Sequence, residues 1–141
     1  MDSQELFRDM VERKASDLFL KVGAPPHLRI DGRLQPVGSQ RLSRAEILQV
    51  AEDLMGPDRR QLFHQQRELN FAFQLEAIGR FRANVLWQRG SIALVVRRVQ
   101  DHIPTFEALH LPAEVLRAFA RERRGLLLIS GSTGNGKSTT A

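Results

Sequence analysis

Apolar and polar positions near the start of the chain first follow a helical period and then alternate. Residues 3–14 place four apolar side chains on one helical face, and Ser3 can cap that helix. The DLFLKV run at 17–22 alternates apolar and polar side chains, which predicts a half-buried strand. Residues 27–37 hold Asp31-Gly32 between two short alternating runs, and this dipeptide is typical of a two-residue β-hairpin turn.

Two further helices and three strands are predicted in the middle of the chain. Ser43 and Glu46 have the spacing of a capping box, so a helix is expected over 44–55 and should end at Gly56-Pro57. A shorter helix is expected to follow, ending at about residue 66. Alternating or mostly apolar runs then predict strands over residues 68–75, 80–88 and 91–99.

The hydrophobic pattern changes again in the last third of the chain. Pro112 suits the first position of a helix that runs to about Arg121. The GLLLIS run at 125–130 is apolar without alternation, which predicts a strand buried on both faces of a parallel sheet. The expected fold class is therefore α+β, followed by the beginning of an α/β domain. The expected boundaries are a first domain at 1–103, an interdomain linker and helix at 104–122, and the second domain at 123–141.

Composition narrows the class of protein. The chain has 141 residues, of which 42% are hydrophobic and 26% charged, as in a globular domain rather than a disordered segment. It has no cysteine, which excludes disulfides, thiolate zinc sites and cysteine nucleophiles. Acidic residues near the N-terminus do not fit a signal peptide, and no apolar run approaches the length of a membrane span, so a cytoplasmic location is expected.

The charge balance raises nucleic acid as a partner but does not favour it. The formal net charge is +5, carried by 18 arginines and 3 lysines that are scattered along the whole sequence. No set of aromatic residues accompanies the arginines as a stacking surface, so no nucleic-acid partner is expected. The four histidines have no metal-ligand spacing. A nucleic-acid binder stays as an alternative that predicts steeply salt-dependent DNA binding.

The strongest chemical signal is a phosphate-binding loop in GSTGNGKS, directly after the apolar 125–130 run. Glycines let backbone N–H groups approach phosphate oxygens, and a helix is expected to begin at the anion. Lys137 is predicted to reach the β and γ phosphates of ATP, Ser138 to hold Mg²⁺, and Thr139 to bind the α phosphate. The candidate nucleotide-binding residues are Gly131, Ser132, Thr133, Gly134, Asn135, Gly136, Lys137, Ser138 and Thr139.

Three stretches together resemble the type IV pilus retraction ATPases, the PilT/PilU group of the secretion ATPase superfamily. They are ASDLFLKVGAPPHLRIDGRL at 15–34, GRFRANV at 79–85 and RRGLLLISGSTGNGKSTT at 123–140. Phe19, where the PilT branch usually has histidine, favours the PilU branch. The LKVGAPP stretch disfavours the assembly and secretion ATPases, which remain an alternative within the superfamily.

This resemblance implies a PAS-like N-terminal domain followed by a RecA-like ATPase domain. It also implies a homo-hexameric ring, or a mixed ring stack with a related retraction ATPase, that drives pilus retraction and twitching motility. Such a motor would be cytoplasmic and peripheral at the inner-membrane base of the pilus, acting on a platform protein in that membrane. Arg82 and Arg97 are the positions that match the family's phosphate-reaching, catalytic arginines. From the residues alone, each arginine could instead pair with a carboxylate such as Glu68 or Glu76.

The same resemblance places the Walker B and catalytic acidic residues beyond residue 141. The chain is therefore expected to be the N-terminal domain of a P-loop ATPase together with the first strand and phosphate loop of a truncated ATPase domain. Residues 1–141 alone are expected to bind ATP weakly or not at all and to be inactive. The alternative from another functional class is a non-enzymatic interaction module that docks onto an intact ATPase ring.

Overall fold

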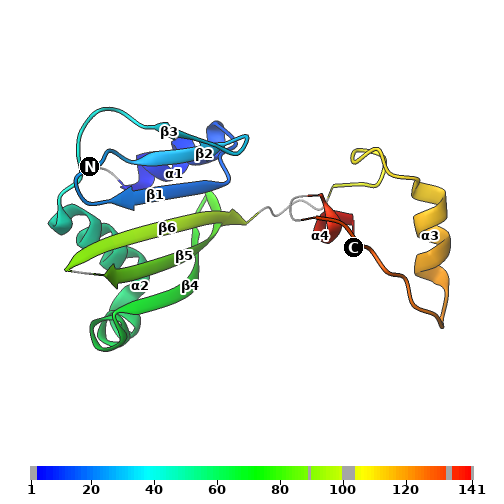
Figure 1. The fold of residues 1–141 in the computed structure, drawn as a ribbon. Coiled ribbons are helices and arrows are strands. Elements are labelled where there is room, and N and C mark those ends of the chain that lie inside the picture. The colour runs from blue at the N-terminus through cyan, green and yellow to red at the C-terminus, as the bar shows by residue number, and fades with distance from the viewer. Residues whose placement is uncertain (1–2, 89, 100–103, 133–134, 141) are drawn as a thin grey trace. The chain divides into compact units, whose positions relative to one another are not determined.

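The computed structural model describes residues 3–88, 90–99, 104–132 and 135–140 (Figure 1). The chain divides into two compact units, Met1–Asp101 and His102–Ala141. Each unit is described by itself.

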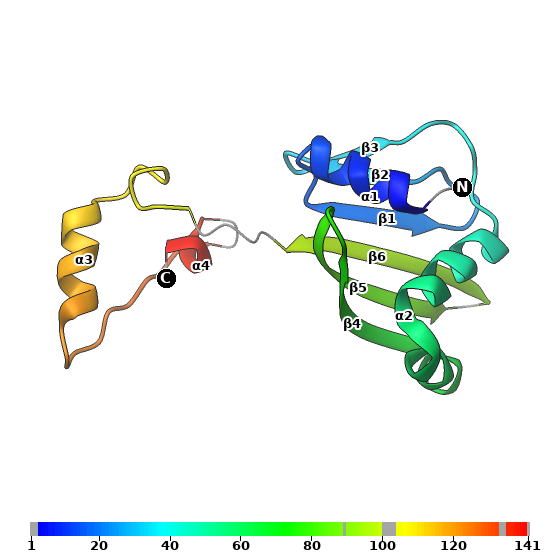
Figure 2. The same ribbon diagram turned by 180° about the vertical axis from the view of Figure 1, so that it is seen from behind.

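The first unit is a mixed α/β unit built on one antiparallel sheet of six strands in the order β3-β2-β1-β6-β5-β4. Both of its helices lie on one face of that sheet and leave the other face open (Figures 1 and 2). The elements are α1 Ser3–Glu12, β1 Asp17–Lys21, β2 His27–Ile30, β3 Arg33–Pro36, α2 Arg44–Gln66, β4 Glu68–Leu75, β5 Gly79–Gln88 and β6 Ser91–Val99.

The core lies between the sheet and the two helices. Alternate strand residues, among them Leu18, Val85 and Leu94, are fully buried on the helix side, as the alternation in the sequence predicts. Phe81 packs at ring-centroid distances of 5.2 Å from Phe7 of α1 and 5.4 Å from Phe73 of β4. This aromatic cluster joins helix α1 to the edge strand β4 of the sheet.

The turn between β2 and β3 has the geometry that its sequence predicts. Asp31 has φ 48° and Gly32 has φ 78°, and a two-residue hairpin loop with two positive φ angles matches the twist of its strands. The hairpin predicted for residues 27–37 is therefore confirmed.

The helix α2 begins at the predicted capping box and breaks at the predicted position. The backbone N–H of Ser43 donates to Glu46 Oε2 at 2.7 Å, and the backbone N–H of Glu46 donates to Ser43 Oγ at 3.2 Å. At Gly56 the backbone leaves helical geometry, with φ 72° and ψ 173°, and Pro57 follows. These two residues divide α2 into the two helical segments that the sequence predicts.

The second unit contains α3, Ala113–Arg121, and the short α4, Lys137–Thr140. None of its described residues is buried. The strand predicted over 125–130 is wrong, because these residues form no strand, and Leu126 and Leu128 are 84% and 79% exposed. A strand needs at least one neighbouring strand to pair with, and every described strand already pairs within the sheet of the first unit.

The structure also bears on membrane insertion. Among the described residues, no helix has the length and apolar character needed to span a bilayer.

Candidate functional site

Four charged residues line up across the open face of the sheet, one on each of four neighbouring strands. Asp17 of β1 lies opposite Arg29 of β2 on one side and opposite Arg97 of β6 on the other. Arg97 in turn lies opposite Arg82 of β5. Directly opposed residues of antiparallel strands point to the same face, so the register alone brings these four side chains into one row.

Asp17 is held from several sides in the centre of this row. It is the one charged residue that is buried in the described parts of the chain, with 4% of its surface exposed. Arg97 Nε donates to its Oδ1 at 2.8 Å, and Ser16 Oγ donates to its Oδ2 at 2.8 Å. Arg29 Nε lies 3.3 Å from Oδ2, which is a charge contact without hydrogen-bond alignment. The carboxylate thus has one oxygen for Arg97 and the other for Ser16 and Arg29.

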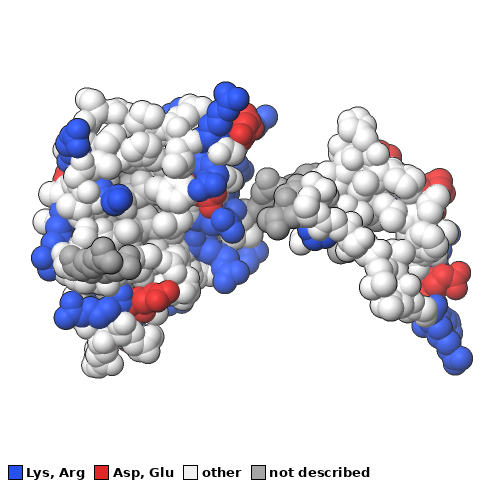
Figure 3. Space-filling view, in the orientation of Figure 1, with Lys and Arg blue, Asp and Glu red and all other residues white. Residues whose placement is uncertain are grey.

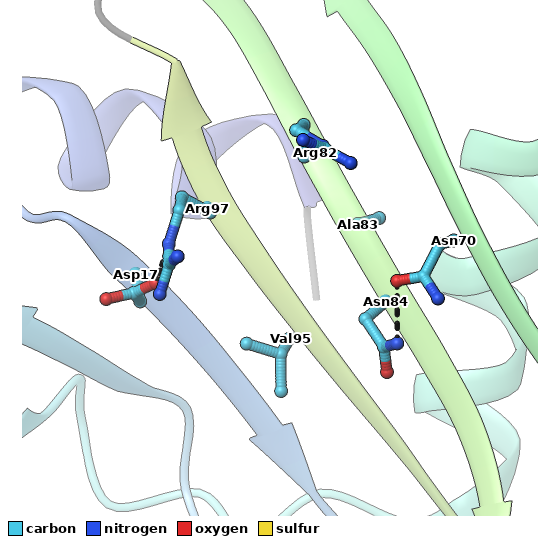
Figure 4. A pocket seen from close by; sticks show the side chains of 7 residues that line it. All are labelled: Asp17, Asn70, Arg82, Ala83, Asn84, Val95 and Arg97. Carbon is cyan, nitrogen blue, oxygen red and sulfur yellow. Dashed lines mark hydrogen bonds and ion pairs between the residues drawn. The ribbon is translucent and has the colours of Figure 1, made fainter. Parts of the chain in front are cut away.

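The predicted pair, Arg82 and Arg97, is brought together by the structure. The two arginines occupy opposed positions on adjacent strands, where like charges repel. The Arg97 side chain stays 72% exposed although its Nε is bonded, so its terminal nitrogens remain accessible. Within the described residues Arg82 is exposed and has no carboxylate within ion-pair distance. The two arginines thus occupy opposed backbone positions, and the Arg97 side chain is turned toward Asp17 of β1 (Figure 4). Two guanidinium groups with one partner carboxylate leave an excess of positive charge on this part of the sheet.

An open hollow of about 390 Å³ lies over these residues on the sheet face (Figure 4). Beside the two arginines, Asn84 Nδ2 donates to Asn70 Oδ1 at 2.7 Å, so a polar pair continues the row of side chains toward β4. Figure 3 shows basic side chains gathered on this face of the first unit where β6 ends, with acidic atoms among them. The residues that line the hollow are Asp17, Asn70, Arg82, Ala83, Asn84, Val95 and Arg97.

The carboxylate partner of Arg97 is Asp17, not Glu68 or Glu76. Glu68 instead is the first residue of β4, where its Oε1 accepts a long 3.5 Å hydrogen bond from Asn84 Nδ2. Asp17 lines the candidate site, and the sequence pattern did not single it out. One signal was present, because Asp17 opens the alternating 17–22 run on the polar side of that strand.

Arg98 has the opposite strand parity from Arg97 and lies away from the hollow. Its Nη1 donates to the backbone carbonyl of Val11 at 3.4 Å, in the last turn of α1 on the helix side of the sheet. This contact ties β6 to the N-terminal segment and is consistent with a structural role for Arg98.

The predicted phosphate loop lies in the second unit. Lys137 Nζ donates to the carbonyl of Ser132 at 2.7 Å, so the ammonium group lies within the loop. Gly136 has φ 73°, a conformation that favours glycine, and its carbonyl accepts from the backbone N–H of Thr139 at 3.0 Å as α4 begins. These are contacts within the segment itself, and phosphate binding by it stays a prediction.

Several of the loop residues named above need separate comment. Thr133 and Gly134 lie outside the described residues. Gly131, Ser132, Asn135, Gly136, Ser138 and Thr139 are all exposed, and Lys137 is half-buried. No group of three or more His, Asp or Glu side chains that could hold a metal occurs in the described parts of the chain. Mg²⁺ binding by Ser138 therefore stays a prediction.

Comparison with known proteins covers almost the whole chain. The family model described as Type II/IV secretion system protein matches residues 2–141. The chain is 40% identical over 140 residues to the type IV pilus ATPase PilU of Pseudomonas aeruginosa, covering 99% of this chain and 36% of PilU. It is 34% identical over 140 residues to the pilus retraction ATPase PilT of the same organism, covering 99% of this chain and 40% of PilT.

A solved structure agrees with these sequence relatives. The crystal structure of the pilus retraction motor PilT with bound ADP matches with a TM-score of 0.81 and 39% sequence identity. That match covers 99% of this chain and 41% of the PilT chain. The chain thus spans about two fifths of the length of the relatives that it matches.

Proposed function

Because the chain belongs to the Type II/IV secretion system protein family, in its PilT/PilU group of pilus ATPases, we propose that it forms the nucleotide-binding N-terminal part of a retraction motor. In this proposal the motor hydrolyses ATP and drives type IV pilus retraction and twitching motility. The higher identity to PilU than to PilT favours the PilU branch.

The observation that carries the proposal is the opposed pair of Arg82 and Arg97 beside an open hollow. A guanidinium group never deprotonates near neutral pH and presents a planar set of donors to phosphate oxygens. Two of them at neighbouring positions can contact one terminal phosphate and balance the charge that develops on it during transfer. Repulsion between the two arginines in the free protein is relieved when an anion binds between them.

The loop residues have complementary roles in this proposal. The backbone amides of Gly131 to Gly136 would surround the phosphates, and Lys137 would exchange its bond to the Ser132 carbonyl for the β and γ phosphates. Ser138 would hold Mg²⁺, which supplies positive charge between phosphate oxygens. Thr139 would contact the α phosphate. The nucleotide itself is supported by the PilT structure, which contains ADP.

The remaining features of the motor are proposed from the relatives. We assign the first unit a PAS-like fold and the second unit the start of a RecA-like ATPase domain. The active form would be a hexamer, or a mixed ring stack with a related ATPase, in the cytoplasm at the inner-membrane base of the pilus. There it would act on the platform protein.

The proposal is tested on the protein expressed from the complete reading frame that contains residues 1–141. We expect Lys137→Ala to abolish ATP hydrolysis and Arg82→Ala or Arg97→Ala to lower kcat by about 100-fold or more. Arg33→Ala is the matched control, because Arg33 is an exposed arginine on the edge strand β3. If both Arg82→Ala and Arg97→Ala leave kcat and KM at the level of the control, the proposal is wrong.

A second measurement concerns residues 1–141 by themselves. We expect these residues to bind ATP weakly or not at all and to release no phosphate, because the proposal places the acidic Walker B residue outside residues 1–141. A measurable rate of phosphate release that Lys137→Ala abolishes would contradict this expectation.

A further inference from the structure

We propose that Asp17 is the positioning residue of this site: it fixes Arg97 through Nε and leaves the terminal nitrogens of that guanidinium group free for a phosphate. The inference rests on the proposed function, since it assumes that Arg97 contacts the nucleotide. It goes beyond that function by assigning a role to a carboxylate that itself touches no nucleotide.

The first argument is that the two carboxylate oxygens of Asp17 have different partners. Oδ2 accepts from Ser16 Oγ at 2.8 Å and lies 3.3 Å from Arg29 Nε. Those two contacts set the direction of the carboxylate, so Oδ1 is presented to Arg97 Nε at 2.8 Å. A carboxylate whose orientation is fixed by contacts to its other oxygen restricts its arginine partner to one rotamer more strongly than a carboxylate without such contacts.

The second argument concerns which nitrogen of Arg97 donates the hydrogen bond to Asp17. A guanidinium group has five N–H donors, one on Nε and four on the two terminal nitrogens. Only the Nε donor is bonded to Asp17 in the structure, and the side chain remains largely exposed. The edge formed by the terminal nitrogens is thus left for a bidentate contact with phosphate.

The third argument is electrostatic. Without Asp17, the row would place Arg29, Arg97 and Arg82 on adjacent or next-adjacent strands with no negative charge among them. Asp17 is buried, so its charge acts on Arg97 in a less polar setting than bulk water. It offsets part of the repulsion between Arg97 and Arg82 while leaving an excess of positive charge for an anion.

The contact is tested directly by NMR on residues 1–141 labelled with ¹⁵N in arginine. We expect the Nε–Hε signal of Arg97 to be shifted and slow to exchange with water in the wild-type chain. Asp17→Asn should abolish this protection, because a neutral amide is a weaker acceptor than a carboxylate. Asp9→Asn is the matched control, since Asp9 of α1 pairs with Arg13 at 3.3 Å, outside the hollow.

The role is tested by ATP hydrolysis in the protein from the complete reading frame. We expect Asp17→Asn to lower kcat on the order of 10- to 100-fold, because the reaction slows when the Arg97 guanidinium group is misplaced. KM should stay unchanged or fall, since the variant site carries more positive charge. In an Arg97→Ala background, Asp17→Asn should have no further effect on kcat, because its role passes through Arg97.

Two additions keep the test decisive if Asp17→Asn weakens the fold. Ser16→Ala removes the donor to Oδ2 and keeps the carboxylate, so it should lower kcat less than Asp17→Asn does. Urea unfolding of each variant, followed by the fluorescence of the single tryptophan, measures any loss of stability separately.

The outcomes separate the two proposals. If Arg97→Ala lowers kcat but Asp17→Asn does not, the positioning role is wrong and the proposed function stands. If Asp17→Asn lowers kcat equally in the Arg97→Ala background, Asp17 acts through the fold and the positioning role is again wrong. If neither Arg82→Ala nor Arg97→Ala changes kcat or KM, the proposed function is wrong, and so is the positioning role that depends on it.

Discussion

Both units of this chain contain apolar stretches, but the two units bury these stretches to very different degrees. In the first unit, alternate residues of β1, β5 and β6 are fully buried beneath two helices. In the second unit, Val115 and Phe119 of the amphipathic helix α3 are each 50% exposed, and the apolar 125–130 run forms no strand. An apolar pattern therefore predicts burial only when the elements that would cover it are present as well.

The same difference extends to the two halves of the proposed nucleotide site. Arg82 and Arg97 are placed by strand register, which a cooperative core maintains. Lys137 is placed by contacts within its own loop. We expect perturbations of the first unit to appear in global unfolding and perturbations of the second unit to leave that transition unchanged.

The largest predicted difference comes from removing a core aromatic ring. Phe81→Ala deletes a fully buried side chain that contacts Phe7 and Phe73, and should lower the free energy of unfolding by about 3–5 kcal/mol. Leu127→Ala in the second unit should change it by less than about 0.5 kcal/mol, because Leu127 is 54% exposed. Urea denaturation followed by Trp87 fluorescence measures both. Equal losses would show that the two units unfold together.

A glycine in each unit gives the next comparison. Gly56 has φ 72° and ψ 173° at the break in α2, and Gly56→Ala should cost about 1–3 kcal/mol of stability because a Cβ disfavours that conformation. Gly125 also has a positive φ, of 133°, but Gly125→Ala should leave the Trp87 transition where it is. Thermal melts of the two variants check this. A shift caused by Gly125→Ala would contradict the separation of the units.

Hydroxyl groups that accept backbone hydrogen bonds provide a smaller effect. Ser43 Oγ accepts from the N–H of Glu46 at the start of α2, and Ser43→Ala should cost about 1 kcal/mol. Thr105 Oγ1 accepts from the N–H of Ala108 at 3.2 Å in the second unit, and Thr105→Ala should not shift the urea midpoint. Chemical denaturation of the pair distinguishes a cap that belongs to the cooperative core from one that does not.

The smallest effect is a dependence on pH. The backbone N–H and hydroxyl of Ser43 lower the pKa of Glu46, whereas the backbone N–H of Glu107 and the Arg117 side chain lower the pKa of Glu107. A carboxyl with a lowered folded-state pKa stabilises the fold above its unfolded pKa of about 4.5, and this contribution is lost as the pH falls through the folded value. Glu46→Gln should remove part of the acid sensitivity of the Trp87 transition, and Glu107→Gln should not. Urea midpoints at several pH values between 3 and 7, roughly the range in which carboxyl groups titrate, test this.

The sequence predicts those parts of the fold whose determinants lie within a few residues. The Asp31-Gly32 turn, the Ser43–Glu46 capping box and the break at Gly56 are each specified by local backbone chemistry, and the structure confirms all three. The strand predicted at 125–130 is wrong because strand formation depends on distant partners.

The candidate site was predictable only in part for the same reason. Strand alternation separates Arg97 from Arg98, and the resemblance to a family selects Arg82 and Arg97. The partner of Arg97 could not be assigned, because Asp17 is 80 positions away and becomes its neighbour only through the pairing of β1 with β6. The pattern of neighbouring residues in the sequence does not specify how β1 pairs with β6.

The pairing of β1 with β6 also has a consequence for biosynthesis. The strand made first lies in the middle of the sheet, and one of its two edges stays open until residues 91–99 have left the ribosome. A nascent chain that has emerged only as far as α2 can form the β1-β2-β3 meander but exposes the unpaired side of β1 to other chains. Closure of the sheet therefore depends on a late, long-range pairing, and pairings of this kind form more slowly than local contacts and leave strand edges exposed in the meantime.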